Sequence, residues 1–157
     1  MIVRPVAPGD LTPMLDLCRD HAAYEQLPFE ENGQVARWGE AFFSGRPHLY
    51  GWVCEEDGRL YGYMTATIDF STWNARPFAY LDCLYLLPEA RRNGNGKHLM
   101  TTLANFAAAH GCPEIQWQTP PHNDLGLGFY RKLPGAVERT KARFTWPVED
   151  SGSEKAQ

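Results

Sequence analysis

The residues from Tyr80 to Met100 constrain the fold more than any other stretch of the sequence. They read as a buried apolar strand that runs through a turn into a helix, and Asn93-Gly94-Asn95-Gly96 opens that helix. Helix N-termini carry unpaired backbone N–H groups and a partial positive charge, and glycine lets an anion approach the backbone closely. Because Arg91 and Arg92 add two full charges, this turn predicts a binding site for a pyrophosphate.

Two well-known phosphate-binding motifs do not fit the spacing of this turn. A P-loop needs a glycine where Arg91 stands and a Ser or Thr after its lysine, but His98 follows Lys97. A dinucleotide-binding fingerprint needs a third glycine, and Leu99 occupies that position. For the two glycines on their own, a glycine-rich helix start that binds no ligand stays open as the alternative.

The rest of the sequence predicts strands and helices that alternate around this segment. Asp10 is placed to cap the first helix, and Glu56-Asp57-Gly58 is typical of a hairpin turn. In chain order we expect a strand (2–6), two helices (11–28 and 32–43), three antiparallel strands (48–54, 60–70 and 78–87), a helix (94–110), a central strand (114–119), a helix (123–133) and one or two final strands (135–147). The polar residues 148–157 predict a disordered tail.

This order of elements predicts the fold class. It corresponds to one α/β (α+β) domain over residues 1–147, with a mixed, mostly antiparallel central sheet of about six to seven strands flanked by about four helices. The chain has 157 residues, of which 43% are hydrophobic, so it can bury a core of this kind.

Composition limits the classes of partner and cofactor. The 15 basic and 19 acidic residues leave a formal charge of −4, which argues against nucleic acid as the main partner. The four cysteines are isolated and the five histidines do not share a metal-site spacing, so we expect no metal. The sequence shows no apolar run of about 20 residues and no signal-peptide pattern, so we expect a cytoplasmic protein with no membrane partner.

Three segments of the second half of the chain resemble one superfamily of enzymes. Arg91-Arg92-Asn93-Gly94-Asn95-Gly96 matches the (Q/R)xxGx(G/A) signature of GNAT superfamily acetyltransferases. The preceding YLDCLYLLPEARR is similar to the family's LxxLYVxPxxRG, and HNDLGLGFYRKLPGA is similar to its Asn-then-FYxxLGA segment. Within the superfamily, AAYEQLP (Ala22–Pro28) and the acidic residue of YLDCLY most resemble the diamine (spermidine/spermine) and thialysine acetyltransferase group. The resemblance implies a GNAT-like N-acetyltransferase that uses acetyl-CoA as co-substrate.

The sequence departs from the family pattern at several positions. Arg92 stands where the family usually has Gly, Asn95 replaces an apolar residue, and Pro134 lengthens the FYxxLGA segment by one residue. Gly126 and Gly128 lie inside a predicted helix, where each costs about 1 kcal/mol relative to Ala. Either the backbone there runs close to the pantetheine arm of the cofactor, or the helix is loosely formed.

The resemblance implies which residues contact the cofactor. Backbone N–H groups of the loop would bind the pyrophosphate, and those of Leu84 and Leu86, near a bulge in the strand 82–87, would polarise the thioester carbonyl. The implied cofactor-binding set comprises Leu84, Tyr85, Leu86, Arg91, Arg92, Asn93, Gly94, Asn95, Gly96, Lys97, Asn123 and Tyr130. Tyr130, about two helical turns after Asn123, would protonate the CoA sulfur. On spacing alone, the favoured interpretation of Tyr130 is a half-buried aromatic residue whose hydroxyl caps the core, and the surrounding motif shifts the preference to the catalytic role.

A base must remove a proton from the amine substrate, because an ammonium has no lone pair. Asp82 is the leading candidate, since it lies in an otherwise apolar strand where burial would raise its pKa. The alternatives are a strand-edge carboxylate paired with Arg76 or Lys97, Glu25 as the base, or a chain of waters.

The expected substrate is a primary amine of a small cationic molecule, bound by Glu25 and Asp82 and acetylated by direct attack in a ternary complex. Further acidic and aromatic residues that could line its pocket, or be ordinary solvated surface, are Glu30, Glu31, Asp69 and Trp73. Other interpretations stay open: acetylation of a protein lysine or N-terminus, acetylation of an aminoglycoside, or a binding module that holds acyl-CoA without catalysis. The resembled group also implies a homodimer.

Overall fold

In the computed structural model, which describes residues 1–149, five strands form one sheet in the order β1-β2-β3-β4-β5. Strands β1 to β3 each pair antiparallel with the next strand, and β5 pairs parallel to β4. The strands are β1 (Ile2–Pro5), β2 (Tyr50–Glu56), β3 (Arg59–Ser71), β4 (Arg76–Leu86) and β5 (Ile115–Gln116). The predicted mixed, mostly antiparallel α/β class is confirmed, with one to two strands fewer in the described chain than expected.

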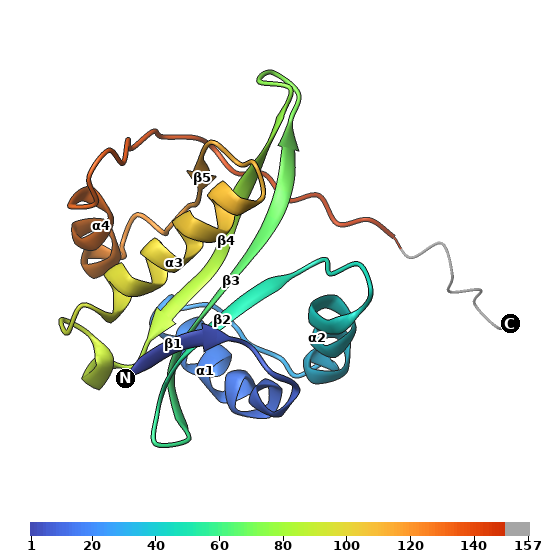
Figure 1. Cartoon of the computed structure of the whole chain (residues 1–157), viewed down its shortest axis with the longest axis vertical. Coiled ribbons are helices and arrows are strands. Elements are labelled where there is room, and N and C mark those ends of the chain that lie inside the picture. Colours follow the sequence, from blue (N-terminus) through green and yellow to red (C-terminus); the bar gives the residue numbers. More distant parts are fainter. Residues whose placement is uncertain (150–157) are drawn as a thin grey trace, which may run out of the picture. The chain divides into compact units, whose positions relative to one another are not determined.

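Four α-helices accompany the sheet in the described residues, and two short 3₁₀ helices lead into α1 and α3 (Figure 1). The helices are α1 (Leu11–Tyr24), α2 (Gln34–Phe43), α3 (Asn95–Ala109) and α4 (Asp124–Arg131), and the 3₁₀ helices are η1 (Pro8–Asp10) and η2 (Pro88–Ala90). The chain divides into two units at residue 120, so the sheet belongs with α1, α2 and α3, whereas α4 belongs to the second unit.

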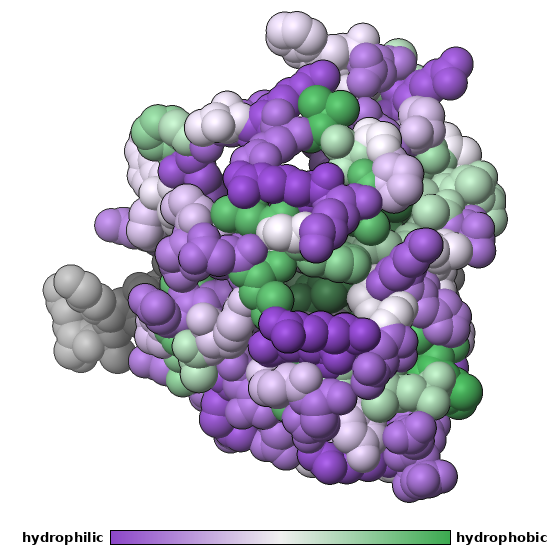
Figure 2. Space-filling view, turned by 90° about the vertical axis from the view of Figure 1, so that its left-hand side faces the viewer, coloured by the Kyte–Doolittle hydropathy of each residue, from purple (hydrophilic) through white to green (hydrophobic). Residues whose placement is uncertain are grey.

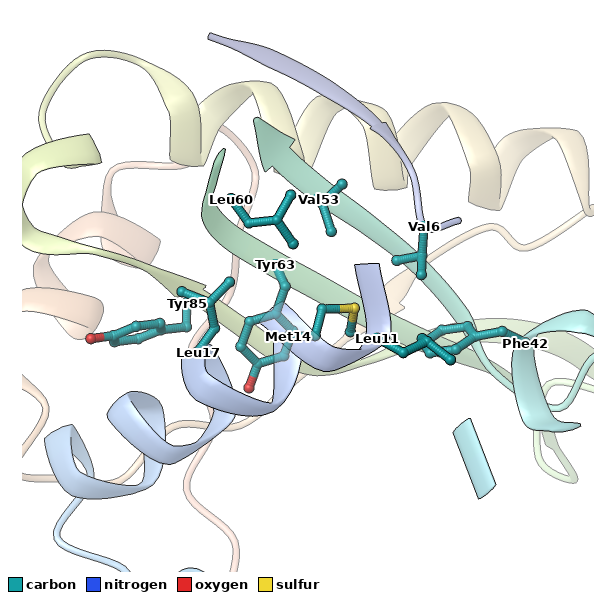
Figure 3. Close-up of a cluster of buried hydrophobic side chains, with 9 residues drawn as sticks. All are labelled: Val6, Leu11, Met14, Leu17, Phe42, Val53, Leu60, Tyr63 and Tyr85. Carbon is teal, nitrogen blue, oxygen red and sulfur yellow. The ribbon is translucent and has the colours of Figure 1, made fainter. Parts of the chain in front are cut away.

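Side chains along β2 alternate between the two faces of the sheet. Val53 is fully buried in a cluster with Leu11, Met14 and Leu17 of α1 and with Phe42 of α2 (Figure 3). The neighbouring Trp52 and Tyr50 instead contact Phe106 of α3, with ring centroids 5.0 and 4.7 Å apart. Because successive strand residues point to opposite faces, α1 and α2 cover one face of the sheet and α3 covers the other.

Local turn chemistry explains the β2–β3 hairpin that the sequence predicts. Asp57 and Gly58 connect the strands with φ of 51° and 79°. Two central residues with positive φ give the turn whose twist matches paired strands. In α2, Phe42 is buried, whereas the adjacent Phe43 is 42% exposed.

Asp10 stands at the N-cap position of α1, as predicted, but its side chain bonds elsewhere. Its Oδ2 atom accepts the Ala7 N–H at 2.7 Å, at the start of η1, and makes no cap hydrogen bond to α1. Arg4 donates to both carboxylate oxygens of Asp10 at 2.7 and 2.9 Å and to Glu55 at 3.1 Å. The bonds from Arg4 hold the pKa of Asp10 below its usual value and join β1, β2 and the start of α1.

Two strand predictions in the last third of the chain are wrong. Only Ile115 and Gln116 of the segment 114–119 form a strand, and this strand lies at the end of the strand order rather than in the centre. Residues 135–147 form no strand, and Phe144 and Trp146 are 91% and 90% exposed. Alternating apolar residues make a strand only where another strand pairs with their backbone.

The remaining features of the described chain are brief. Within the second unit, Arg131 near the end of α4 forms an ion pair with Glu138 at 2.7 Å. Most of the predicted tail, residues 150–157, lies outside the described residues. Figure 2 shows one face of the molecule, on which hydrophilic side chains predominate with hydrophobic ones between them.

Candidate active site

Strand β4 contains a bulge at Asp82. In the ladder with β3, Thr65 pairs with Cys83 and the next residue, Ala66, pairs with Leu81, so Asp82 has no partner position. An extra residue of this kind bends its strand and disturbs the ladder locally. The pairing of β4 with β5 ends at Tyr80, and the bulge lies two residues further along β4.

Beyond the bulge, one edge of β4 has no strand neighbour within the described chain. β5 pairs only with Ala79 and Tyr80, leaving the edge from Leu81 to Leu86 without a strand. The Leu87 N–H donates to Tyr61 of β3 at 2.8 Å. Backbone groups of alternate residues face opposite sides of a strand, so the N–H groups of Leu84 and Leu86 project toward the edge without a strand. An amide-containing ligand can add to such an edge by main-chain hydrogen bonds.

The N-terminus of α3 offers a second set of backbone donors. Gly94 is the N-cap with φ of 81°, and the first intrahelical bond runs from the His98 N–H to the Gly94 carbonyl at 2.9 Å. The N–H groups of the three residues between them, Asn95, Gly96 and Lys97, therefore have no partner within the helix. Arg92, which stands where the family usually has Gly, adopts a left-handed φ of 63°.

Side chains of the turn before α3 divide into inward and outward groups. The Arg91 Nε atom donates to the Leu86 carbonyl at 2.8 Å, and its guanidinium lies 5.0 Å from the ring centre of Tyr24 and 5.5 Å from that of Tyr85. Asn95 is buried and its Nδ2 donates to the Ala90 carbonyl at 2.9 Å. Arg92, Asn93, Gly94 and Lys97 are exposed. Arg91 and Asn95 thus shape the turn, and the charges of Arg92 and Lys97 face solvent.

A polar cluster that sequence reasoning missed lies between the C-terminal end of α1 and the sheet. His21 Nδ1 is 2.7 Å from the hydroxyl of Tyr63, and His21 Nε2 is 3.1 Å from Glu25 Oε1. The imidazole stacks on Tyr85, with centroids 5.1 Å apart and planes inclined by 17°. Burial lowers the pKa of His21, while the carboxylates of Glu25 and Asp82 oppose that shift. The spacing of His21 and Glu25 by four residues on one helix was the available signal.

Asp82 is exposed, whereas the sequence predicted that it is buried. Its side chain is exposed in the bulge, so the burial that was expected to make it a base is absent. Its Oδ2 atom lies 3.7 Å from the thiol of Cys83, which donates to it. Burial raises the pKa of Cys83 to about 12, so this thiol stays protonated. Asp82 is not ion-paired with Arg76 or Lys97 among the described residues.

The second unit carries Asn123 and Tyr130 on α4. Asn123 caps the helix, because its Oδ1 atom accepts the Gly126 N–H at 3.0 Å. A Cβ atom on Gly126 would lie 2.2 Å from Asn123 Nδ2, whereas one on Gly128 would meet nothing within 4 Å. Gly126 therefore makes room for the cap, which gives this glycine a local structural reason. Tyr130 is half-buried, and its ring centroid is 5.3 Å from that of Phe129.

The wider acidic pocket considered from the sequence does not assemble as one site. Glu31 forms an ion pair with Arg19. Trp73 is 98% exposed in the β3–β4 turn, and Asp82 lies six residues along β4 from Arg76, about 20 Å at the usual rise per residue. Glu25 and Asp82 are the carboxylates that both act on His21.

A separate depression borders the turn before α3. It has a volume of about 570 Å³ and is lined by Met1, Glu56, Arg59, Tyr61, Glu89, Asn93 and Asn95. It does not include Asp82 or Glu25. In residues 1–149, no group of three or more His, Cys, Asp or Glu residues is arranged to hold a metal ion, and none of the helices described is long and apolar enough to cross a membrane.

Comparisons with known proteins agree with this geometry. The sequence model of the acetyltransferase (GNAT) family matches residues 14–135. Thialysine N-epsilon-acetyltransferase of Bos taurus is 28% identical over 154 residues, covering 90% of this chain and 87% of that protein. Phosphinothricin N-acetyltransferase of Alcaligenes faecalis is 32% identical over 116 residues, covering 71% of this chain and 56% of that protein.

Solved structures show the same fold. An aminoglycoside acetyltransferase from an uncultured soil metagenomic sample, solved with sisomicin, superposes with a TM-score of 0.78 at 20% identity, covering 94% of this chain and 96% of that one. Together, the family match over residues 14–135, the bulged strand β4 and the glycine-rich start of α3 agree. The chain therefore belongs to the acetyltransferase (GNAT) family and is an acetyl-CoA-dependent N-acetyltransferase.

Proposed function

We propose that the enzyme transfers the acetyl group of acetyl-CoA to a primary amine of a small cationic molecule by direct attack in a ternary complex. The observation that carries this proposal is the pairing of two features on one continuous segment. β4 bulges at Asp82 and has no strand neighbour along one edge beyond it in the described chain, and the same segment then leads through η2 to the unpaired N–H groups at the start of α3. Pantetheine carries amides that suit the strand edge, and pyrophosphate suits the helix N-terminus.

In the proposed reaction a base first removes one proton from the substrate's ammonium, and the freed amine nitrogen then attacks the thioester carbonyl carbon. The N–H groups of Leu84 and Leu86 stabilise the negative charge that develops on the carbonyl oxygen. The carbon–sulfur bond then breaks, the nitrogen releases its second proton to solvent as the amide forms, and the CoA thiolate takes a proton from an acid. We assign the acid to Tyr130 and the base to Asp82. The assignment of Asp82 is supported by its position in the bulge rather than by burial.

We assign binding of the substrate's ammonium to Glu25 and Asp82. Both carboxylates lie near enough to His21 to favour its protonated form, although one comes from α1 and the other from β4. Tyr63 and Tyr85 contact the same imidazole, so the surroundings are aromatic as well as acidic. An ammonium is attracted both by carboxylates and by aromatic faces. Thialysine N-epsilon-acetyltransferase, by its name, acts on an amine at the end of a side chain.

The test is a panel of amines with acetyl-CoA, in which released CoA thiol is measured and each product is identified by mass. The panel contains thialysine, 1,4-diaminobutane, phosphinothricin, an aminoglycoside, a lysine-containing peptide, and neutral amines of matched length. We expect kcat/KM for the small cationic amines, thialysine and 1,4-diaminobutane, to exceed that for neutral amines of the same length by tenfold or more. Activity confined to neutral or anionic amines would refute the cationic substrate, and activity on the peptide or the aminoglycoside alone would assign the alternative substrates.

We propose further that the enzyme acts in the cytoplasm as a homodimer. The support is the resemblance to the diamine and thialysine acetyltransferase group. Light scattering across a range of protein concentrations measures the mass directly. A mass of one chain at concentrations where the enzyme is fully active would contradict the dimer.

A further inference from the structure

His21 is held by three neighbours from three elements, although it belongs to no recognised motif of the sequence. It lies on α1 with only 13% of its side chain exposed. The hydroxyl of Tyr63 on β3 lies 2.7 Å from its Nδ1 atom, and Glu25 Oε1 lies 3.1 Å from its Nε2 atom. Tyr85 on β4 stacks against its ring. Both ring nitrogens and one ring face are therefore engaged.

The chemistry of the partners determines which nitrogen carries the proton. Burial raises the pKa of Tyr63 well above its usual value, so its hydroxyl keeps its hydrogen. A carboxylate is an acceptor only, so Glu25 requires an N–H on Nε2 of the imidazole. In the neutral imidazole, Nδ1 is then the acceptor, and the Tyr63 hydroxyl donates to it. The direction of the chain is thus Tyr63 to His21 to Glu25.

We propose that His21 is a positioning residue for the amine substrate: its Nε2–H holds the carboxylate of Glu25 in the orientation that receives the substrate's ammonium, and the Tyr63 hydroxyl fixes the imidazole in the tautomer that can do so. This inference rests on the proposed function, because it assigns how the amine-binding side of that same site is ordered. His21 contacts neither acetyl-CoA nor the reacting atoms in this account.

The arrangement makes amine binding sensitive to pH. When His21 takes a second proton, it becomes a cation that forms an ion pair with Glu25 and competes with the substrate's ammonium for that carboxylate. Burial lowers the pKa of His21 from 6.5, so the competition develops only below that pH. The titratable and charged groups around His21 are Cys18 of α1, Glu25 at the C-cap of that helix, Tyr63 of β3, Asp82, Cys83 and Tyr85 of β4, and Arg91, which also lies over Tyr85. Burial raises the pKa of Cys18 and Cys83, so both thiols stay neutral in this range.

Two substitutions separate the two hydrogen bonds of His21. In His21→Gln, the side-chain nitrogen is as many bonds from the backbone as Nε2 is, so the donor to Glu25 is kept. In His21→Asn, the side chain reaches only as far as Nδ1, so an acceptor for Tyr63 is kept and the donor to Glu25 is lost. We expect His21→Asn to raise KM for the cationic amine about tenfold, with kcat at saturating amine and the Kd for acetyl-CoA unchanged. His21→Gln should stay within about threefold of the original KM.

The pH dependence of KM for the amine in the same variants distinguishes this role from a purely structural one, which would leave that dependence unchanged. In the original enzyme, KM for the amine should rise as the pH falls below 6.5, and in His21→Gln this rise should be absent. A Tyr63→Phe variant removes the donor to Nδ1 and should raise KM for the amine by a smaller factor. Circular dichroism melting and calorimetric titration with acetyl-CoA check that each variant folds and binds the cofactor.

The outcomes distinguish this inference from the proposed function. If the original enzyme acetylates none of the cationic amines in the panel, the proposed function fails. If it acetylates them but His21→Asn keeps the original KM, or His21→Gln is impaired as strongly as His21→Asn, only the role of His21 is overturned. Should His21→Asn not fold, a KM of the original enzyme that stays constant below pH 6.5 would overturn it instead.

Discussion

The guanidinium of Arg91 lies 5.0 Å from the ring centre of Tyr24, so a residue of the turn before α3 packs on the last residue of α1. The same guanidinium lies over Tyr85, and its Nε atom donates to the Leu86 carbonyl. One arginine therefore ties the predicted pyrophosphate turn both to β4 and to the helix that carries Glu25. We therefore expect Arg91 to act on the turn through these contacts as well as through its charge.

This arrangement predicts that Arg91 and Arg92 differ although they are adjacent and carry the same charge. Arg91→Ala should lower the free energy of unfolding by about 2 kcal/mol and weaken acetyl-CoA binding about tenfold, because it removes a charged hydrogen bond and two cation–π contacts. Arg92 is exposed, so Arg92→Ala should weaken binding by less than about threefold, and only at low salt. Denaturant melts and calorimetric titrations of the two variants measure both quantities. Equal effects would show that Arg91 acts only through its charge.

Tyr130→Phe tests the proposed acid. The substitution removes one hydroxyl and keeps the ring, so the packing against Phe129 is retained. We expect kcat to fall by roughly 10²-fold or more, because the thiolate loses its proton donor. Acetyl-CoA should still bind with the same Kd, which calorimetric titration measures. A variant that turns over at a near-normal rate would remove Tyr130 from the reaction.

Asp82→Asn tests the proposed base in its exposed position. If Asp82 accepts the proton of the amine, kcat should drop about 10²-fold at neutral pH, and the acidic limb of kcat measured at saturating amine should flatten. Saturating amine separates this limb from the effect of His21, which is expected in KM. A variant whose kcat keeps the acidic limb of the original enzyme would leave a water chain or Glu25 as the base.

Gly126 and Gly128 provide a matched pair on α4. Gly128→Ala meets no neighbour and should raise the free energy of unfolding by up to about 1 kcal/mol, because alanine is the better helix former. Gly126→Ala collides with the Asn123 side chain at 2.2 Å and disrupts the cap, which costs about 1 kcal/mol. Denaturant melts should therefore rank Gly126→Ala below Gly128→Ala. The opposite order would mean that the Asn123 cap contributes little.

Local patterns predicted the glycine-rich start of α3, because its residues lie close together in the sequence. The bulge in β4 and the roles of the Leu84 and Leu86 N–H groups were expected only from the resemblance to the GNAT superfamily. The structure contains the bulge. The backbone at Arg92 explains why the family usually has Gly at this position, because Arg92 adopts the left-handed φ for which glycine is suited.

What the sequence could not predict depends on residues far apart along the chain. The cluster of His21 and Tyr63 joins residues 42 positions apart, and nothing in either segment alone indicates the contact. Asp82 looked buried because its neighbours in the strand are apolar, but the bulge places it in an exposed position. The apolar alternation of residues 135–147 indicated strands, but whether such a segment pairs depends on a partner edge elsewhere in the fold.

Amide hydrogen exchange with and without acetyl-CoA locates the cofactor directly on the backbone. If the unpaired N–H groups at the start of α3 bind the pyrophosphate and the edge of β4 binds the pantetheine and thioester, exchange should slow at residues 95–97 and at Leu84 and Leu86 when acetyl-CoA is added. The N–H of Leu87, which is already bonded to Tyr61, should change less. Slowed exchange elsewhere with no change at residues 84–86 and 95–97 would contradict the account.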